Sequence, residues 1–372
     1  MNIVWFSWKD RWHPLAGGAE TVSGEIMDRL ARDGHNITLI TAAYPGATRY
    51  EAKRGVSIYR AGNRFTVYIM AFFSFKKLQK SGGKPDIVID EMNTIPFLSG
   101  VYTHASKKVL LAYQLAREVW FYQMPPIVSH IGYMVEPLYV RILGRIYHTT
   151  ITESQSSKKD FLAHGLRNVK VFRVGMELKP IESLLPKPPT PTVLSLGAVR
   201  PMKRTLDAVK SFEVARDANQ TLRMAIAGDI AGTYGDRVRH YIDSSRHKDA
   251  IEILGRVSSE KKLDLMRTSN VILVTSVKEG WGLIVTEANS QGTPAIVYDV
   301  DGLRDSVQHN QTGVVVANND YHAMGKAINE LVSDSSNYEQ MRSRAWESSR
   351  NYSFEDSYLD FCAQLDIPVV RH

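Results

Sequence analysis

The sequence predicts an α/β protein built from two doubly wound domains, each with a parallel sheet between layers of helices. Three observations carry this prediction. Short apolar runs typical of strands alternate with helical patterns along the whole chain, a proline-rich segment divides it near the middle, and its 372 residues suffice for about two domains.

The alternation of strands and helices is present in both halves. In the first half, strands are expected at residues 3–7, 36–41, 86–90, 109–113, 149–152 and 169–174, with a helix at 19–33 that Gly34 is placed to end. The second half repeats the pattern, with strands expected at 192–197, 223–227, 251–254, 271–275, 295–298 and 313–317. Because doubly wound sheets bind ligands beyond the carboxyl ends of their strands, functional residues should follow these strands.

A cluster of five prolines marks the domain boundary: Pro180, Pro186, Pro188, Pro189 and Pro191. Such a segment forms neither a helix nor a central strand, so we predict a semi-rigid linker at 179–191. The predicted domains are then 1–178 and 192–350. Residues 351–372 are predicted to form a C-terminal helix, with Ser353 as its N-cap.

Composition excludes several classes of protein. With 44% hydrophobic and 23% charged residues, the chain is neither disordered nor fibrous. The lone Cys362 cannot form an internal disulfide, the first residues lack a signal-peptide pattern, and no stretch approaches the roughly 18 apolar residues of a membrane helix. We therefore expect a soluble, cytoplasmic protein. Metal-binding and P-loop motifs are missing from the sequence, so no metal is expected.

The net charge of +7 is unevenly distributed, because the basic excess lies in residues 1–180 while residues 181–372 carry more acidic than basic side chains. This asymmetry indicates an anionic partner for the first half, and a merely solvated basic surface is the alternative. Nucleic acid is not expected, since no nucleic-acid-binding motif accompanies the charge. Residues 65–75, an aromatic-rich apolar stretch before Lys76, Lys77 and Lys80, favour an anionic membrane surface, with a core segment as the alternative.

The first candidate site is the Gly17-Gly18 turn, which follows the first strand and opens the first helix. Glycines let backbone N–H groups approach a ligand, and a helix N-terminus favours negative charge. The turn does not match the GxGxxG dinucleotide pattern. A purely structural role is the alternative.

The second candidate is a basic loop after the first strand of the second half, where Arg200, Lys203 and Arg204 lie within five positions. Three cations at the carboxyl end of a strand could neutralise a diphosphate. A solvated basic loop is the alternative.

The third candidate is the most specific and spans residues 278–288. Gly280 and Gly282 permit a tight turn, the next helix should start near Leu283, and its free N–H groups would face an anion. Glu279 and Glu287 could each accept hydrogen bonds from the hydroxyls of a ribose or a hexose. Two unrelated surface glutamates are the alternative.

Together these motifs resemble the family 4 retaining glycosyltransferases, which have a GT-B fold with two Rossmann-like domains facing a central cleft. The resemblance rests on Glu279-Gly280-Trp281-Gly282-Leu283, Glu287-Ala288 and Gly292-Thr293-Pro294, with further matches at Gly302-Leu303, Gly313, the Gly17-Gly18-Ala19-Glu20 turn and the Lys203 loop. It spans nearly the whole chain. It implies transfer of a sugar from a nucleotide-diphosphate sugar to a glycan or lipid-linked acceptor with retained configuration, without a metal or other cofactor.

The resemblance also implies roles for the domains and residues. The second domain would bind the donor and the first the acceptor, and the last helix would return to the first domain with Cys362 buried and inert. Glu287 would bind the ribose, Glu279 the hydroxyls of the transferred sugar, and Lys203 the leaving diphosphate. Backbone amides would bind the donor phosphates and sugar at Gly282, Leu283 and Ile284, with Gly17 and Gly18 approaching from the first domain.

Two positions depart from the family pattern. Ala198 stands where the family has an arginine, and Arg200 or Arg204 is the candidate replacement. Tyr113 stands where many members have a histidine facing the donor sugar, and a tyrosine is a poor base at neutral pH. His104 is interpreted as an ordinary histidine rather than its substitute. These departures leave a non-catalytic sugar-nucleotide or glycan-binding protein as the alternative function.

Overall fold

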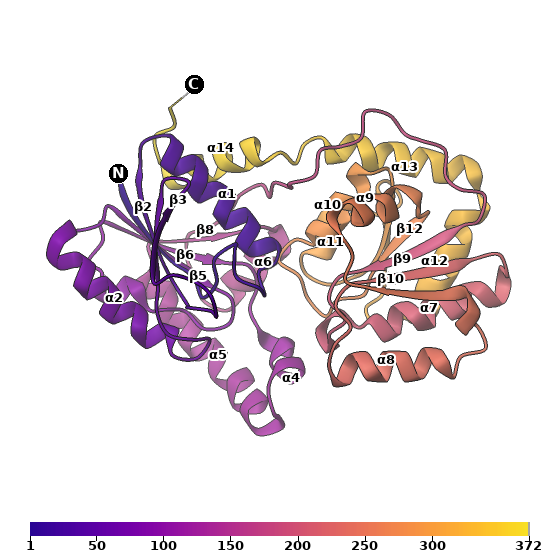
Figure 1. Ribbon diagram of the computed structural model, residues 1–372, viewed down its shortest axis with the longest axis horizontal. Coiled ribbons are helices and arrows are strands. Elements are labelled where there is room, and N and C mark those ends of the chain that lie inside the picture. Colours follow the sequence, from indigo (N-terminus) through magenta and orange to yellow (C-terminus); the bar gives the residue numbers. More distant parts are fainter. Residues whose placement is uncertain (371–372) are drawn as a thin grey trace. The chain divides into compact units, whose positions relative to one another are not determined.

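The computed structural model describes residues 1–370, which form two compact units (Figure 1). The first unit contains Met1–Arg117, His130–Gly175 and the C-terminal segment from Ser353. The second unit contains Met176–Tyr352 together with Glu118–Ser129. We call Glu118–Ser129 the excursion, because the residues before and after it belong to the first unit.

The first unit is built on an eight-stranded sheet with the order β3-β4-β2-β1-β5-β6-β7-β8. Its strands are β1 (Asn2–Phe6), β2 (Asn36–Thr41), β3 (Tyr50–Lys53), β4 (Val56–Arg60), β5 (Ile87–Met92), β6 (Lys107–Ala112), β7 (Thr149–Thr152) and β8 (Val169–Val171). All neighbours are parallel except β3 and β4, an edge hairpin that the sequence analysis did not predict. Its strands are short and joined by only Arg54 and Gly55, so the alternation of strand and helix is broken there.

Helices cover both faces of this sheet. The helices of the first unit are α1 (Gly18–Arg32), α2 (Val67–Gly82), α3 (Ser99–Tyr102), α5 (Pro126–Ile146, which begins in the excursion), α6 (Gln155–Ala163) and α14 (Phe354–Leu365). Val88 and Asp90 point to one face of β5, because side chains two residues apart share a face. Val88 packs with α2, and Asp90 accepts a hydrogen bond from Tyr147 directly after α5. Thus α2 and α5 cover the same face.

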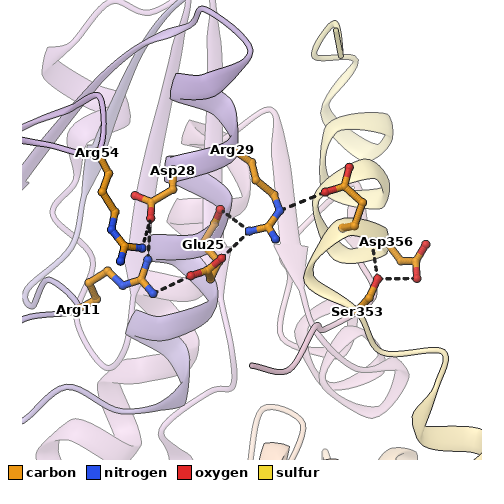
Figure 2. A network of polar contacts seen from close by, with 8 residues as sticks. Arg11, Glu25, Asp28, Arg29, Arg54, Ser353 and Asp356 are labelled. Atoms are coloured by element: carbon orange, nitrogen blue, oxygen red, sulfur yellow. Dashed lines mark hydrogen bonds and ion pairs between the residues drawn. The ribbon is translucent and has the colours of Figure 1, made fainter. Parts of the chain in front are cut away.

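Helix α14 packs beside α1 (Figures 1 and 2). Arg29 of α1 pairs with Glu25 on its own helix at 2.5 Å and with Glu355 of α14 at 3.3 Å (Figure 2). The predicted N-cap is confirmed, because the Ser353 hydroxyl accepts a hydrogen bond from the Asp356 N–H at 3.0 Å.

Aromatic stacking adds to the contact between α14 and the sheet. The ring of Phe361 stacks on Trp5 of β1 with centroids 5.8 Å apart. Cys362, the next residue along the helix, is buried, and burial raises the pKa of its thiol to about 12. The thiol therefore stays protonated and inert at neutral pH.

The second unit has a six-stranded parallel sheet with the order β11-β10-β9-β12-β13-β14. Its strands are β9 (Thr192–Leu196), β10 (Arg223–Ala227), β11 (Ile251–Gly255), β12 (Val271–Val274), β13 (Ala295–Tyr298) and β14 (Gly313–Val316). Every strand predicted from the sequence is present, and the α/β fold class with two parallel sheets is confirmed. The reason is that central parallel strands, buried on both faces, are continuous apolar runs.

The helices of the second unit are α4 (Trp120–Gln123), α7 (Thr205–Ala218), α8 (Thr233–Asp243), α9 (Ser259–Thr268), α10 (Leu283–Ser290), α11 (Leu303–Ser306), α12 (Tyr321–Ser333) and α13 (Ser335–Ser349). Helices α7 to α11 connect its successive strands, α12 and α13 follow the last strand, and α4 lies in Glu118–Ser129. Three 3₁₀ turns complete the described elements, η1 (Arg117–Val119), η2 (Pro201–Lys203) and η3 (Lys248–Ala250). Among residues 1–370, no helix combines the length and the apolar character that crossing a membrane requires.

Candidate active site

The basic loop and the glutamate-glycine loop lie side by side in the second unit. Strands β9 and β12 are neighbours in the sheet, so the loops that follow them leave from the same edge. The Thr275 hydroxyl donates to the carbonyls of Lys203 at 2.8 Å and Arg204 at 3.0 Å. The Val277 N–H donates to the Met202 carbonyl at 2.9 Å. Each of these contacts is made to a backbone carbonyl, so the two loops are held together independently of their charged side chains.

Lys203 and Glu279, predicted separately, form an ion pair across these loops. The Lys203 Nζ lies 2.5 Å from Glu279 Oε1, and the Ser276 hydroxyl donates to the same oxygen at 2.6 Å. Glu279 Oε2 accepts no hydrogen bond from the described residues. The pair is half-buried, with exposed fractions of 37% for the lysine and 18% for the glutamate side chain. A ligand can thus reach both groups, and Glu279 keeps one oxygen free to accept a hydrogen bond from a sugar hydroxyl.

The helix that follows begins at Leu283, as the sequence predicts. Gly282 is its N-cap with φ +93°, and a Cβ there would lie 2.7 Å from Leu303, so both the backbone conformation and the space favour glycine. In the described part of the chain, no acceptor meets the N–H groups of Leu283 and Ile284. Two free donors at a helix N-terminus form a site suited to a phosphate.

Glu287 lies one turn into the same helix, and its partner was missed by sequence reasoning. Its Oε2 pairs with the Lys262 Nζ of α9 at 2.7 Å. Lys262 stands in an ordinary polar helix sequence, so nothing in the local pattern distinguishes it from a solvated lysine. The pairing fixes the carboxylate while it remains partly accessible.

The two candidate replacements for the family arginine at Ala198 have different surroundings. Arg204 has a left-handed backbone and donates to Asn318 at 2.7 Å and to the Tyr122 hydroxyl of α4 at 3.2 Å. Arg200 is exposed, and its side chain has no hydrogen bond or ion pair with any described residue. The structure therefore leaves the guanidinium of Arg200 available to a ligand, whereas Arg204 holds its own loop against α4.

In the first unit, the predicted glycine turn already holds a carboxylate. Gly17 precedes α1 and Gly18 is its first residue, and the Gly17 N–H donates to Glu20 Oε2 at 2.6 Å. The other oxygen of Glu20 pairs with Lys9 at 2.9 Å. The turn can bind negative charge, and in this structure Glu20, one helical turn away, supplies it.

Tyr113 is buried in the first unit against an acid that the sequence analysis missed. Its hydroxyl donates to Glu91 Oε1 at 3.0 Å, and the Trp5 indole donates to Glu91 Oε2 at 2.8 Å. Burial and the nearby Glu20 raise the pKa of Glu91 to about 8, and burial beside Glu91 raises the pKa of Tyr113 well above 10. Tyr113 is therefore a hydrogen-bond donor at neutral pH and not a base.

Two further polar groups follow the neighbouring strands β5 and β6, near Tyr113. Asn93 comes directly after β5 and Gln114 two residues after β6, and the Asn93 Nδ2 and Gln114 Oε1 atoms are buried without a partner among the described residues. His104, in contrast, is exposed before β6 and makes no hydrogen bond or ion pair within the described chain. Orphaned buried polar atoms indicate a place where a ligand could complete the hydrogen bonding.

The raised pKa of Glu91 predicts a pH dependence of stability. Its ordinary value is 4.5 and its folded value about 8, so between these pH values the folded protein binds more protons than the unfolded chain. The free energy of unfolding should thus fall as pH rises from about 5 to about 8. In Glu91→Gln this fall should be smaller. Calorimetric unfolding temperatures across this range test it, and identical slopes for the two proteins would refute it.

Comparison with known proteins identifies the family of this chain. Residues 16–178 match the family model described as Glycosyltransferase Family 4, and residues 179–348 match the one described as Glycosyl transferases group 1. The chain belongs to the group 1 glycosyltransferases. The two matches adjoin, so this glycosyltransferase carries family sequence in both of its units.

Solved structures show that this glycosyltransferase has the GT-B fold. Sucrose-phosphate synthase from Thermosynechococcus elongatus superposes with a TM-score of 0.80 at 18% identity, covering 98% of each chain. Anabaena HepE, solved in complex with UDP-glucose, gives 0.73 at 16% identity and covers 98% of this chain and 99% of its own. At these identities the likeness establishes the fold.

Curated relatives match over a shorter part. The D-inositol 3-phosphate glycosyltransferase of Corynebacterium glutamicum is 28% identical over 169 residues, which are 44% of this chain and 40% of the relative. The matched part thus spans about two fifths of that relative's length. Across residues 1–370, no three His, Cys, Asp or Glu side chains gather as a metal site would require.

Proposed function

We propose that this glycosyltransferase moves a sugar from a nucleoside-diphosphate sugar to a glycan or lipid-linked acceptor, with retained configuration and without a metal or cofactor. The observation that carries the proposal is the Lys203–Glu279 pair beside the free amides of Leu283 and Ile284. These groups offer a cation, two N–H donors and a carboxylate, which a diphosphate and a sugar would each need. A UDP-glucose complex of the structurally similar HepE supports a donor of this class.

The donor would bind in the second unit through charge and hydroxyl recognition. Lys203 and the α10 amides would meet the diphosphate, Glu279 the sugar hydroxyls and Glu287 the ribose. Arg200, which is exposed and unpaired among the described residues, would add a second cation for the diphosphate. Opposite charges on protein and ligand then set the orientation of the donor.

The reaction needs no protein base. The bond between the anomeric carbon and the diphosphate oxygen breaks, a bond to the acceptor oxygen forms, and the acceptor proton passes to the departing phosphate oxygen. Lys203 would act by stabilising negative charge that grows on that oxygen as the bond breaks. The buried Tyr113, which cannot ionise near neutral pH, supports a route in which the leaving group takes the proton.

The acceptor would bind in the first unit. Asn93 and Gln114 have buried polar atoms without partners in the described part of the chain, so acceptor hydroxyls could satisfy them. Glu91 lies on β5 and Tyr113 directly follows β6, so their hydrogen bond would hold that edge of the sheet in place.

A donor panel tests the proposal. Thermal shifts with nucleoside diphosphates identify the nucleotide, because a ligand bound to the native state raises its unfolding temperature. Release of nucleoside diphosphate from the matching nucleotide-sugars then reports turnover, and Glu279→Ala should abolish it. Binding without turnover, with lipid and glycan acceptors supplied, would instead indicate a non-catalytic binding protein.

Glu287→Ala should weaken donor binding more than it slows the chemical step. If Glu287 accepts hydrogen bonds from the ribose, its removal costs roughly 1.5–3 kcal/mol, which is about a tenfold to hundredfold rise in the donor Kd. Calorimetric titration with the donor and single-turnover rates separate the two effects. Glu330→Ala, an exposed glutamate on α12, is the matched control. An unchanged donor affinity in Glu287→Ala would exclude the ribose role.

A further inference from the structure

Exposed apolar side chains form a stripe along α5. Within the first unit they are Ile131, Met134, Val135, Leu138 and Ile142, and Met134 is 75% exposed. Their spacing of three or four residues places them on one helical face. The buried residues of the same helix, among them Val140 and Leu143, lie on the opposite face and pack into the core. The stripe therefore points directly away from the sheet.

Helix α2 and the residue stretch before it repeat this arrangement. Val67, Ala71 and Phe75 are buried against the sheet, which agrees with the interpretation of this segment as core. Phe65, Ile69, Met70 and Phe73 are exposed, and Phe65 is 76% exposed. The segment thus has one apolar side in the core and a second apolar side in solvent. Burial in the core does not explain the second.

The two helices present these sides in the same direction. Both α2 and α5 cover the face of the sheet to which Val88 and Asp90 point, so their outer sides face away from it together. Helix α3 connects them, because the Tyr102 ring packs on Phe72 of α2 and the Gly100 N–H donates to Tyr147 after α5. Exposed Ile95, Leu98 and Val101 lie in or next to this connection. We call the outer side of α2, α3 and α5 the apolar face.

Positive charge accompanies the apolar face. Exposed basic side chains on its helices and their flanks are Arg64, Lys77, Lys80, Arg141 and Arg145. The only acid on α2, α3 or α5 is Glu136, which is buried and accepts hydrogen bonds from the N–H groups of Ala116 and Arg117. A surface that is apolar, basic and without an exposed carboxylate is complementary to an anionic lipid bilayer.

We propose that the apolar face docks this glycosyltransferase on an anionic bilayer, with α2 and α5 lying in the interface plane. The partner is the lipid surface itself. This inference rests on the proposed function in one respect, since a lipid-linked acceptor would then be reached at the membrane. A bilayer matches both features at once, because its acyl boundary takes up the exposed apolar side chains and its anionic headgroups attract charge of a single positive sign.

An environment-sensitive probe can locate the contact. Because Cys362 is buried, Leu138→Cys labelled with a nitrobenzoxadiazole thiol reagent carries its probe on α5. Vesicles of phosphatidylglycerol and phosphatidylcholine should raise the emission several-fold and shift it to the blue. Leu359→Cys, an exposed leucine of α14 on the other side of the sheet, is the matched control and should not respond. Equal responses at both sites would overturn the proposal.

Binding should also depend on the face and on lipid charge. Met134→Glu with Leu138→Glu should weaken co-sedimentation with the anionic vesicles more than tenfold, while Leu359→Glu should not. Both altered positions are exposed, so folding and nucleoside-diphosphate release should be retained. No sedimentation of the wild-type protein at low salt, or equal binding to pure phosphatidylcholine, would overturn the proposal. A wild-type dimer that these substitutions dissociate, without vesicle binding, would assign the face to a second copy and overturn it too.

The vesicle and donor experiments test the docking face and the proposed reaction independently of each other. Vesicle binding that persists in a protein without donor turnover would leave the docking face standing and reject the proposed reaction. Turnover without vesicle binding would reject the docking face alone.

Discussion

Lys203→Ala should lower the single-turnover rate of sugar transfer by about 10²–10³-fold, while the donor Kd changes much less. The physical reason is that charge grows on the leaving diphosphate oxygen as the glycosidic bond breaks, so a cation placed there binds the transition state more strongly than the bound donor. Removing one such group from a water-excluding site typically costs about 3–4 kcal/mol of barrier. Thr275 holds the Lys203 backbone, Val277 holds the neighbouring Met202, and Glu279 holds the Lys203 ammonium, so the group is preorganised.

Two measurements and one further variant test the transition-state role of Lys203. Rapid-quench rates at saturating donor report the chemical step, and titration calorimetry reports the donor Kd. Lys203→Arg retains the charge and should recover most of the rate, because a guanidinium reaches the same oxygens with a different geometry. If Lys203→Ala loses more donor affinity than rate, the lysine binds the ground state and the proposed transition-state role is wrong.

The sequence could predict the sheets and the α10 turn because these depend on local patterns. Central parallel strands are continuous apolar runs, and the start of a helix at Leu283 follows from the glycines before it. The edge hairpin of β3 and β4 could not be predicted in this way, because its two short strands follow each other without a helix between them.

Side-chain partners from distant segments lay outside the reach of local patterns. The pairing of Glu287 with Lys262 and of Arg204 with Tyr122 depends on which elements the fold brings together. Glu91 carried a signal that could have been read, because the adjacent carboxylates of Asp90 and Glu91 inside a buried central strand must find buried partners. The apolar stripe of α5 was also visible in the sequence, but only the structure shows which of its two apolar sides is exposed.

The position of Glu279, and so its pair with Lys203, depends on one close backbone contact. Gly302, the N-cap of α11, has φ +79°, and a Cβ placed on it would lie 2.3 Å from the Glu279 carbonyl oxygen. The Glu279 N–H in turn donates to the Asp301 carbonyl at 3.2 Å. The loop that carries Glu279 is therefore seated directly against residues 301 and 302.

Gly302→Ala should consequently destabilise the second unit and displace Glu279. Left-handed backbone costs a residue with a side chain about 1–2 kcal/mol, and a Cβ forced against backbone adds about 1–3 kcal/mol. We expect a loss of about 2–5 kcal/mol in the free energy of unfolding. In the protein that remains folded, nucleoside-diphosphate release should fall at least tenfold, because moving the backbone of Glu279 breaks the geometry of its pair with Lys203.

Gly255→Ala separates the two causes of this effect. Gly255 also has a positive φ, +65°, but no atom lies within 4 Å of the position its Cβ would take. This variant should lose only the roughly 1–2 kcal/mol of backbone strain and keep its turnover. Denaturant unfolding and the nucleoside-diphosphate release assay are then compared between the two variants. If they lose equal stability and equal activity, the contact between Gly302 and the Glu279 loop does not position the catalytic pair. If Gly302→Ala alone loses turnover, the site requires the close contact between Gly302 and the Glu279 loop. Glycine at this position is then explained by catalysis as well as by folding.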